Sequence, residues 1–273
     1  MTVSKKKRLD VLLVEKGLFP SREKARAAVM AGQVLVAGNK VEKPGTSVLE
    51  EADLRLLQEA VPFVSRGGLK LEKAVHSFGL DLQGKTVLDV GASTGGFTDC
   101  ALKHGAAKVY AIDVGYGQLA WELRKDSRVV SLERTNIRYL TPEQLGDRAD
   151  VATIDVSFIS LTKVLPAVLG LVSEEGIIVA LIKPQFEAGK ELVEKKGVVR
   201  DPGVHREVLL RVLRFAGELG LVVTNLAYSP IRGPEGNIEY LAELQRNPSG
   251  QPTGELSEKV SILVEEAHLN LQN

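Results

Sequence analysis

Cysteine is almost absent from this chain, since Cys100 is the only one among 273 residues. No intramolecular disulfide can form, and the cysteine usage gives no sign of an oxidising compartment. Methylation at carbon 5 of a pyrimidine needs a nucleophilic cysteine, and Cys100 lies in a helical segment where a core role is expected. The N-terminal lysines precede no apolar segment typical of a signal peptide, so we expect a cytoplasmic protein.

Long apolar runs and clustered metal ligands are missing as well. No uncharged apolar run approaches the roughly 18 to 20 residues that span a bilayer, which disfavours direct membrane lysis. The four histidines, 76, 104, 205 and 268, follow no metal-ligand spacing, so no metal site is predicted. Methylation of exocyclic amines usually goes with a (D/N/S)-P-P-(Y/F) turn after the fourth strand, and the corresponding segment "DVSF", 155–158, contains no proline.

The formal net charge is +0, but the charge is unevenly spread along the chain. Residues 1–26 hold eight lysines and arginines against three acidic residues. A basic end on an otherwise balanced chain indicates a surface for a polyanion.

Residues 8–56 form a small unit of their own. "RLDVLLVEKG" and "SREKARAAVMAG" predict two short helices, and "QVLVAGNKVEKPGTSV" alternates like strands interrupted by turns. This pattern resembles the S4-like RNA-binding module, which implies an RNA-facing surface formed by Arg8, Arg22, Lys24 and Arg26. A solvated helical hairpin that only docks on its neighbour is the alternative. We place this domain at 1–60 and a linker at 61–64, with the second domain at 65–273.

Beyond the linker, predicted strands alternate with predicted helices. The strands are "TVLDVGA", "KVYAIDV", "VVSLER", "VATIDV", "GIIVALIK", "LVVTNLAYSP" and "NIEYLAELQ". The main helices are expected over 95–104, from Gln118, over "SLTKVLPAVLGLVS" and "HREVLLRVLRFAGELG", and over 257–268. This alternation predicts a mostly parallel α/β sheet with helices on both faces. The last two strands lie close in sequence and suit an antiparallel hairpin at one edge.

The first predicted strand of this region runs into a glycine-rich turn, "DVGASTGG", 89–96. Such glycines let the backbone approach a nucleotide-like ligand, and the following helix start offers free amides. Asp113 ends the next strand, where a carboxylate can bind both ribose hydroxyls of NAD or of S-adenosylmethionine. Ser93 replaces the second glycine of the G-x-G-x-x-G dinucleotide pattern. The turn more closely resembles the acidic-x-G-x-G-x-G turn of S-adenosylmethionine-dependent methyltransferases, with serine in place of the middle glycine. A tight structural turn without a ligand is the alternative.

Charged residues also stand where other predicted strands begin or end. Asp155 and Lys183 follow two strands, and Glu239 precedes the last one. Ligands of doubly wound sheets bind at the carboxyl ends of the strands. Upstream, Lys70 lies beside the apolar stripe of its predicted helix and is expected to be half-buried, whereas Lys73 points to solvent.

In order and context, the K-D-K-E set of ribose 2′-O-methyltransferases related to FtsJ is matched by Lys70, Asp155, Lys183 and Glu239. Together with the S4-like module and the motifs "GASTGGFTD", "LERTN", "KPQFE" and "GPEGNIEY", the chain resembles the TlyA family from about residue 7 to 245. That family, formerly labelled hemolysin, methylates cytidine riboses of 16S and in many members 23S rRNA. The resemblance implies a Rossmann-like class I methyltransferase fold, S-adenosylmethionine as cofactor, and rRNA or ribosomal subunits as partners. It leaves the oligomeric state open.

The resemblance also implies roles for individual residues. Lys183 is expected to act as the base, with Asp155 orienting it and Glu239 holding Lys70 or the ribose. The expected cofactor contacts are Asp89, Gly91, Ala92, Ser93, Gly95, Gly96, Phe97, Asp113, Asn136 and Asp155, and Arg66 is added to the RNA contacts. Asn136 stands where related enzymes carry an acidic residue for the adenine. A non-catalytic rRNA-binding or ribosome-assembly factor is the rival interpretation.

Overall fold

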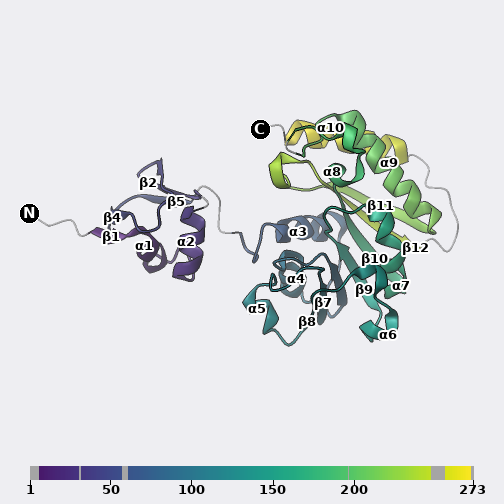
Figure 1. Ribbon diagram of the computed structural model, residues 1–273, viewed down its shortest axis with the longest axis horizontal. Helices are drawn as coiled ribbons and strands as arrows, with labels where there is room; N and C mark the ends of the chain where they lie inside the picture. Colours follow the sequence, from purple (N-terminus) through teal and green to yellow (C-terminus); the bar gives the residue numbers. More distant parts are fainter. Residues whose placement is uncertain (1–5, 31, 57–60, 196, 247–255, 272–273) are drawn as a thin grey trace, which may run out of the picture. The chain divides into compact units, whose positions relative to one another are not determined.

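The computed structural model describes residues 6–30, 32–56, 61–195, 197–246 and 256–271. It divides into two compact units, Met1–Pro62 and Phe63–Asn273, each described here by itself (Figure 1). Phe63 and Val64, which the sequence predicts to lie in a linker, belong to the second unit. The Val64 amide donates to Asp99 at 2.8 Å, and the Phe63 ring fills the space beside Gly68.

The first unit is a small α+β fold that has both predicted helices. These are α1 (Leu9–Glu15) and α2 (Arg22–Met30). Strand β1 (Lys6–Arg8) pairs with β4 (Ser47–Leu49), and β2 (Val34–Val36) lies between β3 (Asn39–Lys40) and β5 (Leu54–Leu56). The inward faces of both helices meet in one core that includes Leu9, Leu12, Leu13, Ala25 and Val29.

A buried carboxylate fixes the two helices of this unit to each other. The Asp10 side chain is 0% exposed and accepts hydrogen bonds from Arg8 at 3.0 Å and from Arg22 at 3.0 Å. These bonds lower the pKa of Asp10 to about 2, the Arg8 bond being the largest cause. Both arginines keep about half of their side-chain surface in solvent, so they belong to the basic surface as well as to the ion pairs.

The second unit is built on a seven-stranded sheet of order β11-β12-β10-β9-β6-β7-β8. Its strands are β6 (Thr86–Val90), β7 (Lys108–Ile112), β8 (Val129–Leu132), β9 (Ala149–Ile154), β10 (Val172–Ile182), β11 (Leu221–Tyr228) and β12 (Tyr240–Arg246). Strands β6 to β10 are parallel to their neighbours, whereas β12 is antiparallel to both β10 and β11. The mostly parallel sheet with an antiparallel hairpin at one edge is thus confirmed, and β12 lies one strand in from that edge.

Helices cover both faces of this sheet, as predicted. One face packs on α7 (Leu165–Leu171), α9 (Pro202–Glu218) and α10 (Leu256–Asn270), which share one apolar core with alternate strand residues (Figure 1). The other face carries α3 (Gly67–Phe78) and α4 (Gly96–Lys103), which contact each other. Short helices complete the unit: α5 (Trp121–Arg124), α6 (Pro142–Leu145) and α8 (Pro184–Glu187).

Two predicted elements differ from the observed ones. The helix expected from Gln118 begins at Trp121 and lasts one turn, because 113–120 curve around the end of β7 and Asp113 binds the Gly115 amide. The helix expected through residue 173 ends at Leu171, where β10 begins, and β10 is irregular between Val172 and Ile177. Most of the loop expected at 246–256 lies outside the described residues. Over the described residues, the helices are too short or too polar to cross a bilayer.

Replacing Asp10 tests the ion pairs of the first unit. Asp10→Asn should lower the free energy of local opening of α1 and α2 by about 1 to 3 kcal/mol, because hydrogen bonds to a charged group are lost. Since the pKa of Asp10 is lowered from 3.8 to about 2, this stabilisation should be complete above pH 3.8 and vanish as the pH falls toward 2. Amide hydrogen exchange of α1 and α2 in the intact chain measures the free energy of local opening.

Asp53→Asn is the matched control. The exposed side chains of Asp53 and Arg55 pair at 2.9 Å in the same unit, and such exposed pairs contribute about 0 to 1 kcal/mol. Equal changes in exchange for the two variants would contradict the role given to Asp10.

Candidate active site

A cleft opens where the sheet order reverses, between the carboxyl ends of β6 and β9. Two adjoining hollows, each with a volume of about 470 Å³, share Gly91, Ser93, Asp155 and Ser157 in their walls. Strands β7 and β8 continue the sheet in one direction and β9 and β10 in the other, so the loops after β6 and β9 separate here. Ligands of doubly wound sheets bind at this switch point.

The glycine turn forms the floor of the cleft and needs its glycines at specific places. Gly91 has φ +87°, and a Cβ there would lie 2.5 Å from the carbonyl oxygen of Asp155. A Cβ on Gly96 would lie 2.3 Å from the Ser65 hydroxyl, where α3 and α4 begin side by side. Ser93, which replaces a glycine of the dinucleotide pattern, has φ +48°. Gly91 and Gly96 thus allow close contacts between segments that side chains would separate.

Asp113 and Asn136 line one hollow, which the turn also borders. The Ser93 amide donates to Asp113 at 2.8 Å and the Gly115 amide donates at 2.7 Å, so both carboxylate oxygens are held by backbone. A carboxylate has about four acceptor sites, which leaves two free for hydroxyl groups of a ligand. Asn136 accepts from the Arg138 amide with its side-chain oxygen, leaving its NH₂ group as a donor.

Asp89 lies beneath the turn rather than in the cleft wall. It is 1% exposed and accepts hydrogen bonds from Thr98 at 2.6 Å and from Thr153 at 3.3 Å. Burial raises the pKa of Asp89 to about 7. Gly95 is also absent from the cleft wall, because it packs against Leu123 and Leu119. Among the expected cofactor contacts, these two residues support the turn from behind, while Gly91, Ala92, Ser93, Gly96 and Phe97 line the cleft.

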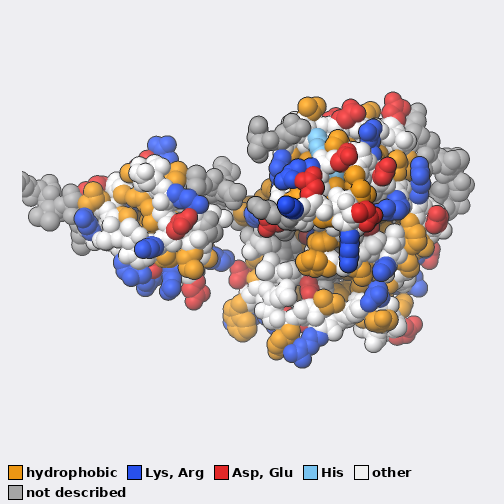
Figure 2. All heavy atoms as spheres, turned by 45° about the horizontal axis from the view of Figure 1, so that its top comes forward, with side chains coloured by type: hydrophobic (Ala, Val, Ile, Leu, Met, Phe, Trp, Pro, Cys, Tyr) orange, Lys and Arg blue, Asp and Glu red, His pale blue; other side chains and the backbone are white. Residues whose placement is uncertain are grey.

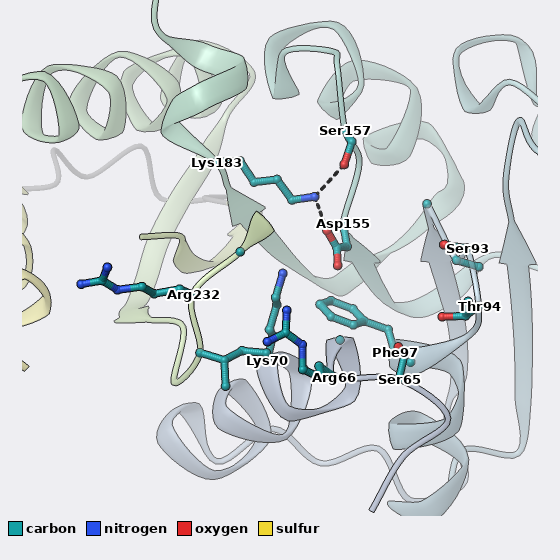
Figure 3. Close-up of a pocket in the computed structure, with 16 residues that line it drawn as sticks. Ser65, Arg66, Lys70, Ser93, Thr94, Phe97, Asp155, Ser157, Lys183 and Arg232 are labelled. Atoms are coloured by element: carbon teal, nitrogen blue, oxygen red, sulfur yellow. Dashed lines mark hydrogen bonds and ion pairs between the residues drawn. The ribbon is translucent and has the colours of Figure 1, made fainter. Parts of the chain in front are cut away.

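The four charged residues of the K-D-K-E set form two ion pairs. Lys183 Nζ lies 2.6 Å from Asp155 Oδ1 and donates to the Ser157 hydroxyl at 3.0 Å. Lys70 Nζ donates to Glu239 Oε2 at 2.5 Å. Lys70 and Lys183 are each 7% exposed, so Lys70 is more deeply buried than the half-buried position predicted. Figure 3 shows both ammonium groups directed at one space beside Asp155.

Strand alternation explains why these residues meet. In β6, β9, β10 and β12, the even-numbered residues Leu88, Ile154, Ile182 and Tyr240 belong to the core beneath α7, α9 and α10. The odd-numbered neighbours Asp155, Lys183 and Glu239 therefore point to the other face, which α3 covers. Lys70 reaches the same space from α3. The burial of the adjacent residues thus explains why Asp155, Lys183 and Glu239 lie on one side of the sheet.

Several residues of this cleft escaped the sequence analysis. Gln185 donates to Glu239 Oε1 at 3.2 Å, and Gly233 leaves room for that carboxylate, since a Cβ there would lie 2.3 Å from it. Ser65 and Arg232 line the cleft beside Arg66 (Figure 3). Ser157 and Gln185 each stand two residues beyond a recognised charged residue, a spacing that could have revealed them.

The expected RNA contacts fall in both units. Arg8, Arg22, Lys24 and Arg26 are exposed in the first unit, where Asp10 holds Arg8 and Arg22 together. In Figure 2, lysine and arginine side chains gather on one side of this unit. Arg66 belongs to the second unit and lines the cleft together with Lys70, Arg232 and Lys183.

The residues present fit S-adenosylmethionine. Gly91 leaves the floor of the cleft free of a side chain, and the start of α4 lies at its wall, where helix amides favour an anionic group such as a carboxylate. Asp113 offers free acceptor sites for ribose hydroxyls in the adjoining hollow. The two hollows together thus provide donors and acceptors for both ends of such a molecule.

Comparison with known proteins assigns both units. Residues 63–246 match the FtsJ-like methyltransferase family and residues 7–54 match the S4 domain. The chain is 47% identical over 244 residues to the 16S/23S rRNA (cytidine-2′-O)-methyltransferase TlyA of Mycobacterium tuberculosis, covering 89% of this chain and 91% of that protein. It is 44% identical to Hemolysin A of Brachyspira hyodysenteriae, covering 86% and 98% of the two chains.

A solved structure from Streptococcus thermophilus, which also carries a hemolysin name, agrees over nearly the whole length. It has a TM-score of 0.78 and 44% sequence identity, and the match covers 99% of this chain and 98% of that one. The fold, both family matches and these relatives confirm the resemblance found in the sequence. The chain belongs to the TlyA family, in which an S4 domain precedes an S-adenosylmethionine-dependent, FtsJ-like methyltransferase domain.

Proposed function

We propose that this protein transfers a methyl group from S-adenosylmethionine to the ribose 2′-hydroxyl of a cytidine in ribosomal RNA, within a ribosomal subunit or its rRNA. The observation that carries the proposal is the convergence of Lys70, Asp155, Lys183 and Glu239 at the cleft beside the glycine turn. The substrate follows from the relatives named for cytidine 2′-O-methylation.

Methyl transfer to a ribose hydroxyl requires that the methyl group and the hydroxyl be positioned and that one proton be removed. When bound, S-adenosylmethionine supplies a methyl group already activated by its sulfonium. A ribose hydroxyl is a weak nucleophile until its proton is removed. Lys183, in its neutral form, accepts that proton at Nζ, while Asp155 and Ser157 fix the direction of its side chain. Holding the reacting groups in line contributes a large part of the rate.

Lys70 and Glu239 complete the site from the opposite wall. Glu239 is 0% exposed and also accepts from Gln185, so its position is fixed by two donors. It holds Lys70 with the ammonium group in the cleft, where this group orients the ribose. Asp155 lies in the walls of both hollows and so adjoins both the ribose and the cofactor.

Replacing Lys183 tests the base. Lys183→Ala should reduce methyl transfer by at least about 100-fold, because general base catalysis typically contributes 10² to 10⁴. Binding of S-adenosylmethionine should change little. Transfer of labelled methyl groups to rRNA, mapping of the 2′-O-methylated nucleotides and titration calorimetry measure these effects. Lys163→Ala, at an exposed lysine outside the cleft, should retain full activity. Unchanged turnover of Lys183→Ala would exclude Lys183 as the base, whereas absence of methyl transfer by the unaltered protein would favour a non-catalytic rRNA-binding factor.

Replacing Asp113 separates cofactor binding from chemistry. Asp113→Ala should weaken S-adenosylmethionine binding about 10-fold or more, because the ribose acceptors and the anchor of two backbone amides are both lost. The rate at saturating cofactor should fall much less than the affinity. Asp126→Ala, which removes a carboxylate paired with Arg128 away from the cleft, is the control. A large loss of rate with unchanged affinity would contradict the assignment.

The S4 domain is proposed to bind rRNA through phosphate contacts. Arg26→Gln should weaken rRNA binding about equally for different sequences and reduce the slope of log affinity against log salt by about one. Arg55→Gln, at an exposed arginine of the same unit that is paired with Asp53, should change little. Removing residues 1–60 should have a larger effect in the same direction. Equal affinity and salt slope for the truncated and intact proteins would refute this role.

A further inference from the structure

Glu72, His76 and His104 come together on the second unit, where α3 packs on α4. Their ligand atoms, one from each side chain, all lie within 4.8 Å of one another. The imidazole rings of His76 and His104 meet edge to face, with centroids 5.8 Å apart. The sequence shows no metal-ligand spacing because His76 and His104 are 28 positions apart in the chain.

The backbone holds the three side chains in place. Glu72 and His76 are four residues apart in α3 and therefore lie one above the other on the same helix face. His104 follows the last residue of α4, and its amide donates to the Cys100 carbonyl. At about 100° per residue, Lys70 lies on the opposite side of α3 from Glu72. The cluster thus lies apart from the cleft, whose walls contain none of its three residues.

The donor set suits a transition metal. Two imidazole nitrogens and one carboxylate oxygen match Zn²⁺ and similar ions, whereas Mg²⁺ and Ca²⁺ prefer oxygen ligands. Within the described part of the chain, no hydrogen bond or ion pair engages these three side chains. Cys100 lies one turn before His104 but is fully buried, and burial raises the pKa of its thiol, so it supplies no thiolate. His76 is exposed, which leaves a coordination position open to water.

We propose that Glu72, His76 and His104 form a site for one divalent transition-metal ion such as Zn²⁺. Bound zinc joins the last turn of α3 to the end of α4. Helix α3 carries Lys70, and α4 begins at the glycine turn, so the ion braces two helices that meet behind the cleft. The proposal is independent of the methyl transfer itself.

Titration of the tag-free, metal-stripped full chain with Zn²⁺ tests the site. At about pH 8, where an ordinary imidazole is neutral, we expect one Zn²⁺ per chain by calorimetry and by competition with a chromophoric chelator. Glu72→Gln, His76→Gln and His104→Gln should each weaken binding by at least about tenfold. Replacement of zinc by Co²⁺ should give the visible absorption of a four-coordinate ion with nitrogen and oxygen ligands.

Glu258→Gln, at an exposed helical glutamate of α10, is the matched control and should bind Zn²⁺ like the original chain. Hydrogen exchange of the unaltered chain gives a readout that needs no variant, because zinc should slow exchange in the last turns of α3 and α4. Absence of stoichiometric binding would overturn the proposal. Binding that survives all three ligand replacements, or zinc protection confined to the region of His205 and His268, would overturn it as well.

Discussion

Two lysine-carboxylate ion pairs at the rim of one sheet are the interactions on which this site depends. Removing one partner of a buried pair costs about 3 to 5 kcal/mol, yet replacing both partners by apolar residues is often neutral or stabilising. The ion pairs of Lys70 with Glu239 and of Lys183 with Asp155 are therefore weak evidence of a stabilising role. The two pairs, at 2.5 and 2.6 Å, lie in or beside a polar cleft next to the glycine turn, and this placement supports the role proposed for them in methyl transfer.

The sheet topology makes this convergence possible. The strand order reverses between β6 and β9, which separates their following loops and opens the cleft. Strand β12 then returns antiparallel beside β10, and its amino end brings Glu239 next to the carboxyl end that carries Lys183. Because β12 is antiparallel to β10, the residue just before β12 lies at the same edge of the sheet as the residues that follow the parallel strands.

Helix α3 connects the cleft with the surface behind it. Its apolar stripe packs on the sheet and on α4, one flank presents Lys70 to Glu239, and the other presents Glu72 and His76 to His104. The position of Lys70 therefore depends on how α3 is held against α4. In the S4 domain, Asp10 has a comparable effect, because it orders two arginines that remain exposed on the basic surface.

The sequence by itself determined the local elements and their order. Periodicity predicted most of the helices and strands, the glycine turn marked the nucleotide-type site, and Asp155, Lys183 and Glu239 stood at the ends of predicted strands. The resemblance of the motifs to the TlyA family was also carried by local segments. The sequence left open whether Glu239 holds Lys70 or the ribose, and only the tertiary structure showed the contact between Glu239 and Lys70 across 169 positions. It also showed that Asp89 lies outside the cleft wall and that His76 meets His104. Periodicity predicts which face of an element is buried, but the partners of a side chain depend on contacts between distant segments, which periodicity does not specify.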